Sequence, residues 1–333
     1  AINFNGTAIS ATAAELNLLD GATSLATSVN GLSDALVEDN SLYLGNDPSG
    51  TTSTAEYNVA VGATALDAIT TGDGNAAFGH NSLTANTSGA YNVGIGNSTL
   101  AANTSGVSNL AIGHVALGSN TTGNYNVGVG HSALNGNTTG TRNTALGYGS
   151  LDYPDTEDDN LAIGYDALGG SIAGGEYNVA IGNYSLDANT SGDYNVAIGY
   201  DALTSNTSGA RNTASGYRSL NSNTTGSYNT ASGYKSLYSN TTGTNNTALG
   251  YESGDVITTG TNNVMLGYQT DPSAADATNQ IVIGKGATGH GDNIAVIGNG
   301  SATAIHPHDD DEVDLRTTTY HKNDHKHDAT AYD

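Results

Sequence analysis

The sequence predicts an all-β fold, a parallel β-roll or β-solenoid of about fifteen coils of 17 residues each. Three observations predict it. A motif of the type Asn-Val-Ala-Val-Gly begins at Asn58 and recurs every 17 residues, its residues alternate between bulky and small, and glycine and leucine follow at fixed distances. A unit this short cannot bury its own apolar side, so successive units are expected to stack along one axis.

The repeat keeps its frame through most of the chain, and we number each unit from its Asn as position 0. Ser41-Leu42-Tyr43-Leu44-Gly45 lies one period before Asn58 and predicts a first coil in which Ser replaces Asn. One residue is inserted before Asn178, and the frame then resumes. The repeats begin at Asn58, Asn75, Asn92, Asn109, Asn126, Asn143, Asn160, Asn178, Asn195, Asn212, Asn229, Asn246, Asn263 and Gln280.

Positions +1 to +3 predict a short strand in each coil. Position +2 is Ala or Gly in every unit from Asn58 to Asn246, whereas +1 and +3 are mostly bulky or β-branched. We expect +1 and +3 to face the inside of the coil and the small +2 residue to face outward, toward a neighbouring chain. The trimer contacts expected on this basis are Ala60, Ala77, Ala111, Ala180 and Ala197.

The rest of each unit predicts corners and a second inward side chain. Glycine at +4 allows positive φ and close stacking of backbones. Leucine at +8 supplies a second apolar side chain for the interior. Asn-Thr-Ser/Thr-Gly from position +11 has the composition of a polar turn. Each coil is therefore expected to have two short strands and two corners.

Segments outside the regular repeat divide the chain. Residues 1–40 are predicted to be a connector, a short helical segment or a coiled coil, and residues 299–333 a His- and Asp-rich tail. Residues 41–150 and 178–298 are the two parts of the β-roll array, separated by an irregular acidic and Gly-rich seam at 151–177. The coiled-coil seam expected in the first segment consists of Leu18, Leu25, Val29, Leu32 and Leu36.

The composition excludes several classes of function. The 333 residues contain no Cys, which excludes disulfides and thiolate metal sites. With 8 Lys+Arg against 32 Asp+Glu the net charge is −24, which is opposite to that of a nucleic-acid binder. No run of the sequence approaches the ~20 apolar residues of a membrane span, so no membrane insertion of this segment is expected.

The repeat resembles two known families. Asn-Val-Ala-Ile-Gly, at Asn178 and Asn195, resembles the head repeat of trimeric autotransporter adhesins, although the unit here is longer. The longer unit that begins at Asn246 with Asn-Thr-Ala-Leu-Gly-Tyr, after the turn at Asn240, is closer to repeats in phage tail-fibre-like proteins. The segment 11–21 also resembles parts of phage structural proteins. The repeat resemblance covers roughly residues 41–298.

This resemblance implies a non-catalytic structural fibre or adhesin shaft of a phage virion that positions a receptor-binding tip. The family pattern implies a homotrimer on a virion surface or outside the cell, in contact with a cell-surface receptor or glycan and with other virion or surface proteins. A bacterial cell-surface trimeric adhesin that mediates attachment is the alternative. An ice-binding solenoid is a third, disfavoured because Thr87-Ser88 and Thr121-Thr122 are adjacent and point to opposite faces of a strand.

Two repeated residue types are candidate binding or modification sites. Tyrosines at position +5 are expected to form a ladder, for which structural packing or trimer contact is favoured over the binding of a receptor or glycan. The Asn-Thr-Ser/Thr turns match the glycosylation acceptor pattern, with stacked turn residues as the alternative. The tyrosines are Tyr148, Tyr165, Tyr200, Tyr217, Tyr234 and Tyr251, and the asparagines are Asn86, Asn103, Asn120, Asn137, Asn189, Asn206, Asn223 and Asn240.

The tail contains the candidate metal ligands. His306 and His308 form one His-x-His motif, and His325 and His327 form another. A strand presents residues i and i+2 on one face, so three chains would bring six imidazoles together. We expect Fe or another divalent metal there, as in phage fibre tips of similar pattern, with a solvated tail as the alternative; no other cofactor is required.

No catalytic residue is predicted. His131-Ser132 is the only pair that suggests a nucleophile beside a base, but His131 shares position +5 with the tyrosines. A catalytic histidine needs an orienting carboxylate as well as a nucleophile. The repeat pattern predicts no such group beside it.

Overall fold

The computed structural model describes residues 3–4, 7–8, 35–38, 40–45, 48, 52–154, 156–172 and 175–299. Within these ranges all regular structure is β-strand, and there is no helix. One large sheet begins with β3 (Ala35–Glu38) and β4 (Ser41–Leu44). It continues through β5 (Val59–Val61), β6 (Ala76–Phe78), β7 (Val93–Ile95), β8 (Leu110–Ile112), β9 (Val127–Val129), β10 (Thr144–Leu146), β12 (Leu161–Ile163), β14 (Val179–Ile181), β15 (Val196–Ile198), β16 (Thr213–Ser215), β17 (Thr230–Ser232), β18 (Thr247–Leu249), β19 (Val264–Leu266), β20 (Ile281–Ile283) and β21 (Ala295–Ile297).

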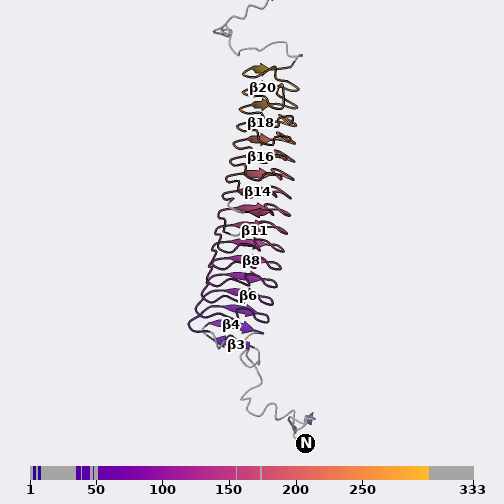
Figure 1. Ribbon diagram of the computed structural model, residues 1–333. Helices are drawn as coiled ribbons and strands as arrows, with labels where there is room; N and C mark the ends of the chain where they lie inside the picture. Colours follow the sequence, from indigo (N-terminus) through magenta and orange to yellow (C-terminus); the bar gives the residue numbers. More distant parts are fainter. Residues whose placement is uncertain are drawn as a thin grey trace, which may run out of the picture. The chain divides into compact units, whose positions relative to one another are not determined.

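Each coil adds one strand to this sheet in parallel with the last. Val59 pairs with Ala76, Ala76 with Val93, and the matching continues coil by coil to β21. Only β3 runs antiparallel, beside β4 at the start of the sheet. The coils lie one upon another from β4 to β21 (Figure 1). The stack has about 14 turns of about 17 residues each, which confirms the predicted all-β parallel β-solenoid.

The side chain at +2 points into the coil, so the predicted orientation of the strand is wrong. Ala60 and Ala197 have no exposed surface, whereas their neighbours at +1 and +3 are half-buried or exposed. The interior is too thin for large side chains from both sides: a Cβ added to Gly128, also at +2, would lie 3.4 Å from Leu117 Cγ. The expected trimer contacts are therefore buried inside their own chain and unavailable to another: Ala60, Ala77, Ala111, Ala180 and Ala197.

The leucines at +8 fill the other side of this interior, as the sequence predicted. All eleven from Leu66 to Leu237 are fully buried, and each has a left-handed backbone, with φ +53° at Leu66 and +49° at Leu237. This conformation costs an L-residue about 1–2 kcal/mol, and a β-branched residue fits it worst. Leucine branches at Cγ rather than at Cβ, and burial of its side chain contributes about 2 kcal/mol, which offsets the strain.

Two buried columns of asparagine tie the coils together. At position 0, Asn75 N–H donates to Asn58 Oδ1 (2.8 Å), and Asn58 Nδ2 donates to the carbonyl of Gly72 (2.9 Å). Ser41 begins this column by accepting from Asn58 N–H (2.9 Å), which confirms its predicted place in the first coil. The backbone N–H of the asparagine in each coil donates to the side-chain oxygen in the preceding coil. Stacking of the coils therefore satisfies the buried Oδ1 atoms of this column.

The second column consists of the asparagines at +11. Asn103 Nδ2 donates to Asn86 Oδ1 (2.8 Å) and to the carbonyl of Gly106 (3.1 Å). Pro154 and Ser171 take position +11 in two successive coils and divide this column, which ends where an isoleucine takes the position, at Ile257. Asn240 Oδ1, one coil earlier, is buried and has no hydrogen-bond partner in the described structure. The isoleucine side chain has no hydrogen-bond donor, so the unpaired Asn240 Oδ1 is the last acceptor of the column.

The acidic and Gly-rich seam at 151–177 does not interrupt the main sheet. β12 pairs with both β10 and β14 in the regular register. The irregular residues instead form a separate two-stranded sheet, in which β11 (Tyr153–Pro154) runs parallel to β13 (Ser171–Ile172). The inserted residue is thus absorbed at a corner, and the predicted arrays 41–150 and 178–298 are one continuous stack.

The segment before the coils is described only in part. β1 (Asn3–Phe4) and β2 (Thr7–Ala8) pair antiparallel. Leu36, expected in a coiled-coil seam, lies in β3 and packs against the core, so a helix at this residue is wrong. The other residues predicted for that seam, and the tail beyond residue 299, lie outside the described residues.

Candidate binding surface

Position +5 carries a column of stacked aromatic rings, which is completed in the coil of Asn178 by Tyr184 at position +6. Ten rings follow one another at centroid separations of 4.8 to 5.9 Å, mostly stacked face to face. The column begins at His114 and ends at Tyr268, where the Lys285 ammonium lies 5.9 Å from the ring centroid. Its members are His114, His131, Tyr148, Tyr165, Tyr184, Tyr200, Tyr217, Tyr234, Tyr251 and Tyr268.

This column brings together all six tyrosines that are candidates for binding a receptor or glycan. Aromatic rings hold sugars mainly through their faces, and here most faces are covered by the rings of adjacent coils. What remains accessible is the row of ring edges and hydroxyls. The arrangement favours the packing alternative, in which each stacked pair contributes about 1 kcal/mol to the cohesion of the coils.

His131 and Ser132 lie in contact, with Nδ1 and Oγ 3.0 Å apart. The His131 ring is also stacked between His114 and Tyr148. In the part of the chain that the structure describes, no carboxylate is hydrogen-bonded to this ring. The pair therefore lacks the third group of a nucleophilic triad.

Position −1, at the corner before each strand, carries a second exposed column. Its tyrosines Tyr177 and Tyr194 stack at 4.9 Å. The guanidinium of Arg211 follows and lies between two rings, 5.3 Å from the centroid of Tyr194 and 5.5 Å from that of Tyr228. Arg211 Nη1 also donates to the Tyr228 hydroxyl (3.2 Å).

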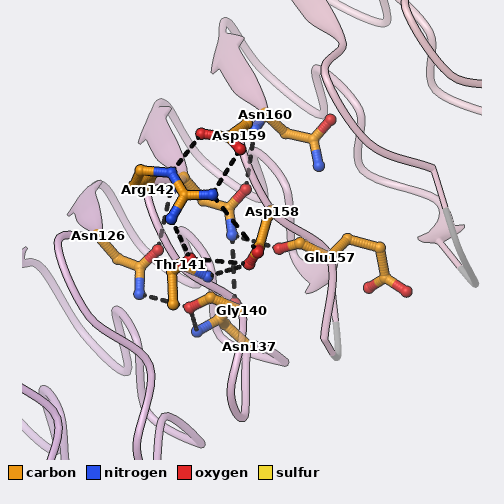
Figure 2. Close-up of polar contacts among 10 residues, drawn as sticks. Asn126, Asn137, Gly140, Thr141, Arg142, Glu157, Asp158, Asp159 and Asn160 are labelled. Carbon is orange, nitrogen blue, oxygen red and sulfur yellow. Dashed lines mark hydrogen bonds and ion pairs between the residues drawn. The ribbon is translucent and has the colours of Figure 1, made fainter.

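The same column contains a two-carboxylate clamp on Arg142, shown in Figure 2. Arg142 Nε and Nη2 each lie 2.6 Å from a carboxylate oxygen of Asp159, one coil later, and Asp158 approaches to 3.6 Å. Hydrogen bonding to Arg142 lowers the pKa of the Asp159 carboxyl, and the same bond raises the pKa of the Arg142 guanidinium. Part of the acidic loop is therefore neutralised by the preceding coil.

Figure 2 also shows how both asparagine columns meet at one carbonyl. Asn126 from position 0 and Asn137 from +11 both donate through Nδ2 to the oxygen of Gly140, at 2.8 and 3.1 Å. In the acidic loop Glu157 takes the place of this glycine, and its backbone oxygen accepts from Asn143 Nδ2 (2.6 Å). The loop thus keeps the backbone contact of the repeat while changing its side chains.

The predicted glycosylation sites are incompatible with this geometry. All eight asparagines at +11 are completely buried. Their Nδ2 atoms, the atoms that would carry a glycan, donate to the column and to the turn carbonyl, as Asn206 does to Asn189 (2.8 Å) and Gly209 (2.9 Å). The interpretation as stacked turn residues holds for Asn86, Asn103, Asn120, Asn137, Asn189, Asn206, Asn223 and Asn240.

The outer face of the main sheet is apolar over most of its length. Positions +1 and +3 carry valine, isoleucine or leucine in most coils and point away from the core, as Ile198 does with 41% of its surface exposed. Only β16 and β17 carry hydroxyl side chains at both positions. A contiguous apolar surface on this scale is typical of an interaction surface.

A pair of carboxyls near the end of the stack makes stability depend on pH. Burial, together with the neighbouring carboxyl of Asp255, raises the pKa of Asp271 to about 6. Asp271 Oδ1 is buried without a hydrogen-bond partner in the described structure. Because the folded-state pKa lies above the unfolded value, this group's contribution to stability is full below about pH 4 and is lost as pH rises toward 6.

We expect Asp271→Asn to stabilise the protein at pH 7.5 and to leave it nearly unchanged at pH 4. The gain is about 1 kcal/mol, reduced from the full pKa shift because the carboxyl is only half-buried. Urea denaturation at both pH values measures it. Asp276→Asn removes the same charge from an exposed side chain and serves as the control; an equal gain from both variants would contradict the carboxyl-pair explanation.

The tail histidines His306, His308, His325 and His327 lie outside the described residues, and the described part holds no group of three or more His, Asp or Glu side chains arranged to bind a metal. Nor does any helix long and apolar enough to cross a membrane occur there. Sequence reasoning missed the cation contacts of Arg142 and Arg211. The signal was present, because both residues stand at position −1, among the tyrosines.

No protein-family model matches the chain, and no curated protein and no solved structure matches it.

Proposed function

We propose that this chain is a non-catalytic structural shaft of the tail-fibre or adhesin type, located on a virion or outside the cell, in which copies associate as a homotrimer. The observation that carries the proposal is the continuity of the stack. The strand register and the asparagine column at position 0 repeat coil after coil, and the asparagines at +11 and the aromatic rings extend over runs of successive coils. These polar groups and rings hold neighbouring coils together. A scaffold that positions other groups needs this regularity, whereas an active site interrupts it.

The outer sheet face supports association of copies. Its valine, isoleucine and leucine side chains at +1 and +3 lie on one side of most coils, so two or three such faces would cover one another along the stack. This surface takes over the role first assigned to the +2 alanines. A bacterial surface adhesin built on the same shaft remains the second candidate, since its chemistry of association is identical. The hydroxyl pairs of β16 and β17 span too few coils to favour ice binding.

Ile198→Glu tests the proposed association. Introducing a carboxylate on the apolar face is expected to convert trimers into monomers at micromolar concentration, because a charge without a partner would be buried between chains. Sedimentation velocity measures the change. Thr242→Glu adds the same charge to an exposed turn and is expected to leave the trimer intact. Equal masses for the two variants would contradict association through this face.

A further inference from the structure

The column at position −1 contains two tyrosine pairs with the same geometry but different contents. Tyr194 and Tyr228 stand two coils apart and hold the guanidinium of Arg211 between their rings. Tyr91 and Tyr125 also stand two coils apart, and the residue between them is Ser108. We call the space between the rings of Tyr91 and Tyr125, above Ser108, the Tyr91–Tyr125 slot.

The backbone is the same in both places. The φ angles are +59° at Tyr91 and Tyr125 and +57° at Ser108, and they are +57°, +61° and +58° at Tyr194, Tyr228 and Arg211. Ser108 N–H donates to the carbonyl of Ala90 at 2.9 Å, as Arg211 N–H does to that of Asp193. The two sites therefore differ in the side chain between the rings and not in the frame that holds them.

The rings of the Tyr91–Tyr125 slot are also more open to solvent. Tyr91 and Tyr125 are 68% and 60% exposed, compared with 49% and 54% for Tyr194 and Tyr228. Neither ring stacks on another ring in the described structure. The Tyr91 ring lies toward the preceding coil, over Gly74, where an added Cβ would meet its Cδ1 at 2.9 Å. The Tyr91 ring therefore has a glycine at position −1 of the preceding coil, where Tyr194 has the stacked ring of Tyr177.

We propose that the Tyr91–Tyr125 slot binds the guanidinium of an arginine in a partner protein. A planar cation is attracted to the faces of both rings, and Arg211 shows that this spacing accommodates one. The net charge of −24 favours a cationic partner. The chain's own described cations are already engaged, each with a carboxylate or a ring: Arg142, Arg211, Arg218, Lys235 and Lys285.

The inference goes beyond the proposed shaft function, because it assigns a ligand to one place on the surface. The probe is N-acetyl-arginine amide, titrated into the full chain labelled with 3-fluorotyrosine and followed by ¹⁹F NMR. Tyr91→Phe and Tyr125→Phe assign the two resonances. We expect both to shift with half-saturation at about 100 mM, the range of two exposed cation–π contacts, while Tyr153, exposed to a similar 55%, does not shift.

Two variants distinguish binding in the Tyr91–Tyr125 slot from general attraction of a cation to the acidic chain. Ser108→Arg is expected to fill the slot from within, as Arg211 does, and to weaken binding at least 10-fold without removing either tyrosine. Ser191→Arg adds the same charge to an exposed turn and is expected to preserve binding. N-acetyl-lysine amide is expected to bind several-fold more weakly, since it lacks the planar group.

Equal shifts at all exposed tyrosines, an absence of shifts, or full binding by the Ser108→Arg variant would each overturn the proposal. Light scattering on the same samples reports the mass of the assembly. A failure of the slot is thereby distinguished from a failure of the proposed trimer.

Discussion

Gly199→Ala is expected to break the stack between two coils and to destabilise the protein by at least about 4 kcal/mol. Gly199, at position +4, has φ +137°, and a Cβ there would lie 2.5 Å from the carbonyl oxygen of Gly216 and 2.7 Å from its carbon. Both contacts are with backbone that is itself paired, so the clash cannot be relieved by a side-chain rotation. Guanidinium denaturation followed by circular dichroism measures the loss.

The matched control is Gly286→Ala. Gly286 also has a positive φ, +62°, but an added Cβ would meet nothing within 4 Å. Only the conformational cost of a left-handed alanine, about 1 kcal/mol, is expected there. If both variants lose the same stability, the close approach of successive glycines is not what shapes the corner.

Asn195→Ala is expected to cost about 3 kcal/mol, because it opens the column at position 0 in the middle of the stack. Asn195 Oδ1 accepts from the N–H of Asn212 (3.0 Å) and from its Nδ2 (3.2 Å), and Asn195 Nδ2 donates to the carbonyl of Gly209 (2.9 Å). Alanine leaves the buried Asn212 N–H without its acceptor. Asn212 Nδ2 and the Gly209 carbonyl each lose one hydrogen bond and keep another, to the Gly226 carbonyl and from Asn206 Nδ2.

Native-state hydrogen exchange locates the effect of Asn195→Ala. Exchange is expected to accelerate at β15 and β16 before it does at the distant β7, since each coil contacts only its neighbours. Asn97→Ala, at the surface, is the control and is expected to cost less than about 0.5 kcal/mol. Uniform acceleration along the stack would show instead that the coils unfold as a single unit.

The period of the sequence was enough to predict the coil and its corners. Glycine at +4 has the positive φ that its chemistry predicted, as at Gly199, and leucine at +8 has the predicted burial, as at Leu203. The second short strand expected in each coil is wrong, because the leucines have positive φ and each regular coil contributes one strand. The alternation of bulky and small residues at +1 to +3 correctly predicted a strand, but it did not determine which face of the strand points into the coil. The coil is thin, so the small residue fills the interior and the bulky residues face outward, the reverse of the usual pattern.

The candidate sites were less predictable, because a motif does not report burial. Asn-Thr-Ser/Thr identifies an acceptor sequence, but the coil needs the same asparagine amides for its interior hydrogen bonds. The tyrosines at +5 were recognised as a ladder, whereas the coverage of their faces follows only from the stacking distance. The contact of Arg211 with two rings follows from position −1 once coils are known to stack in register.

The most direct test of the shaft proposal is the solution mass of the purified full chain, measured by light scattering over a range of concentrations. A mass of three chains that persists on dilution is the predicted result, and it would support the trimer. A stable single chain at all concentrations would contradict the trimer and would leave that face to another partner.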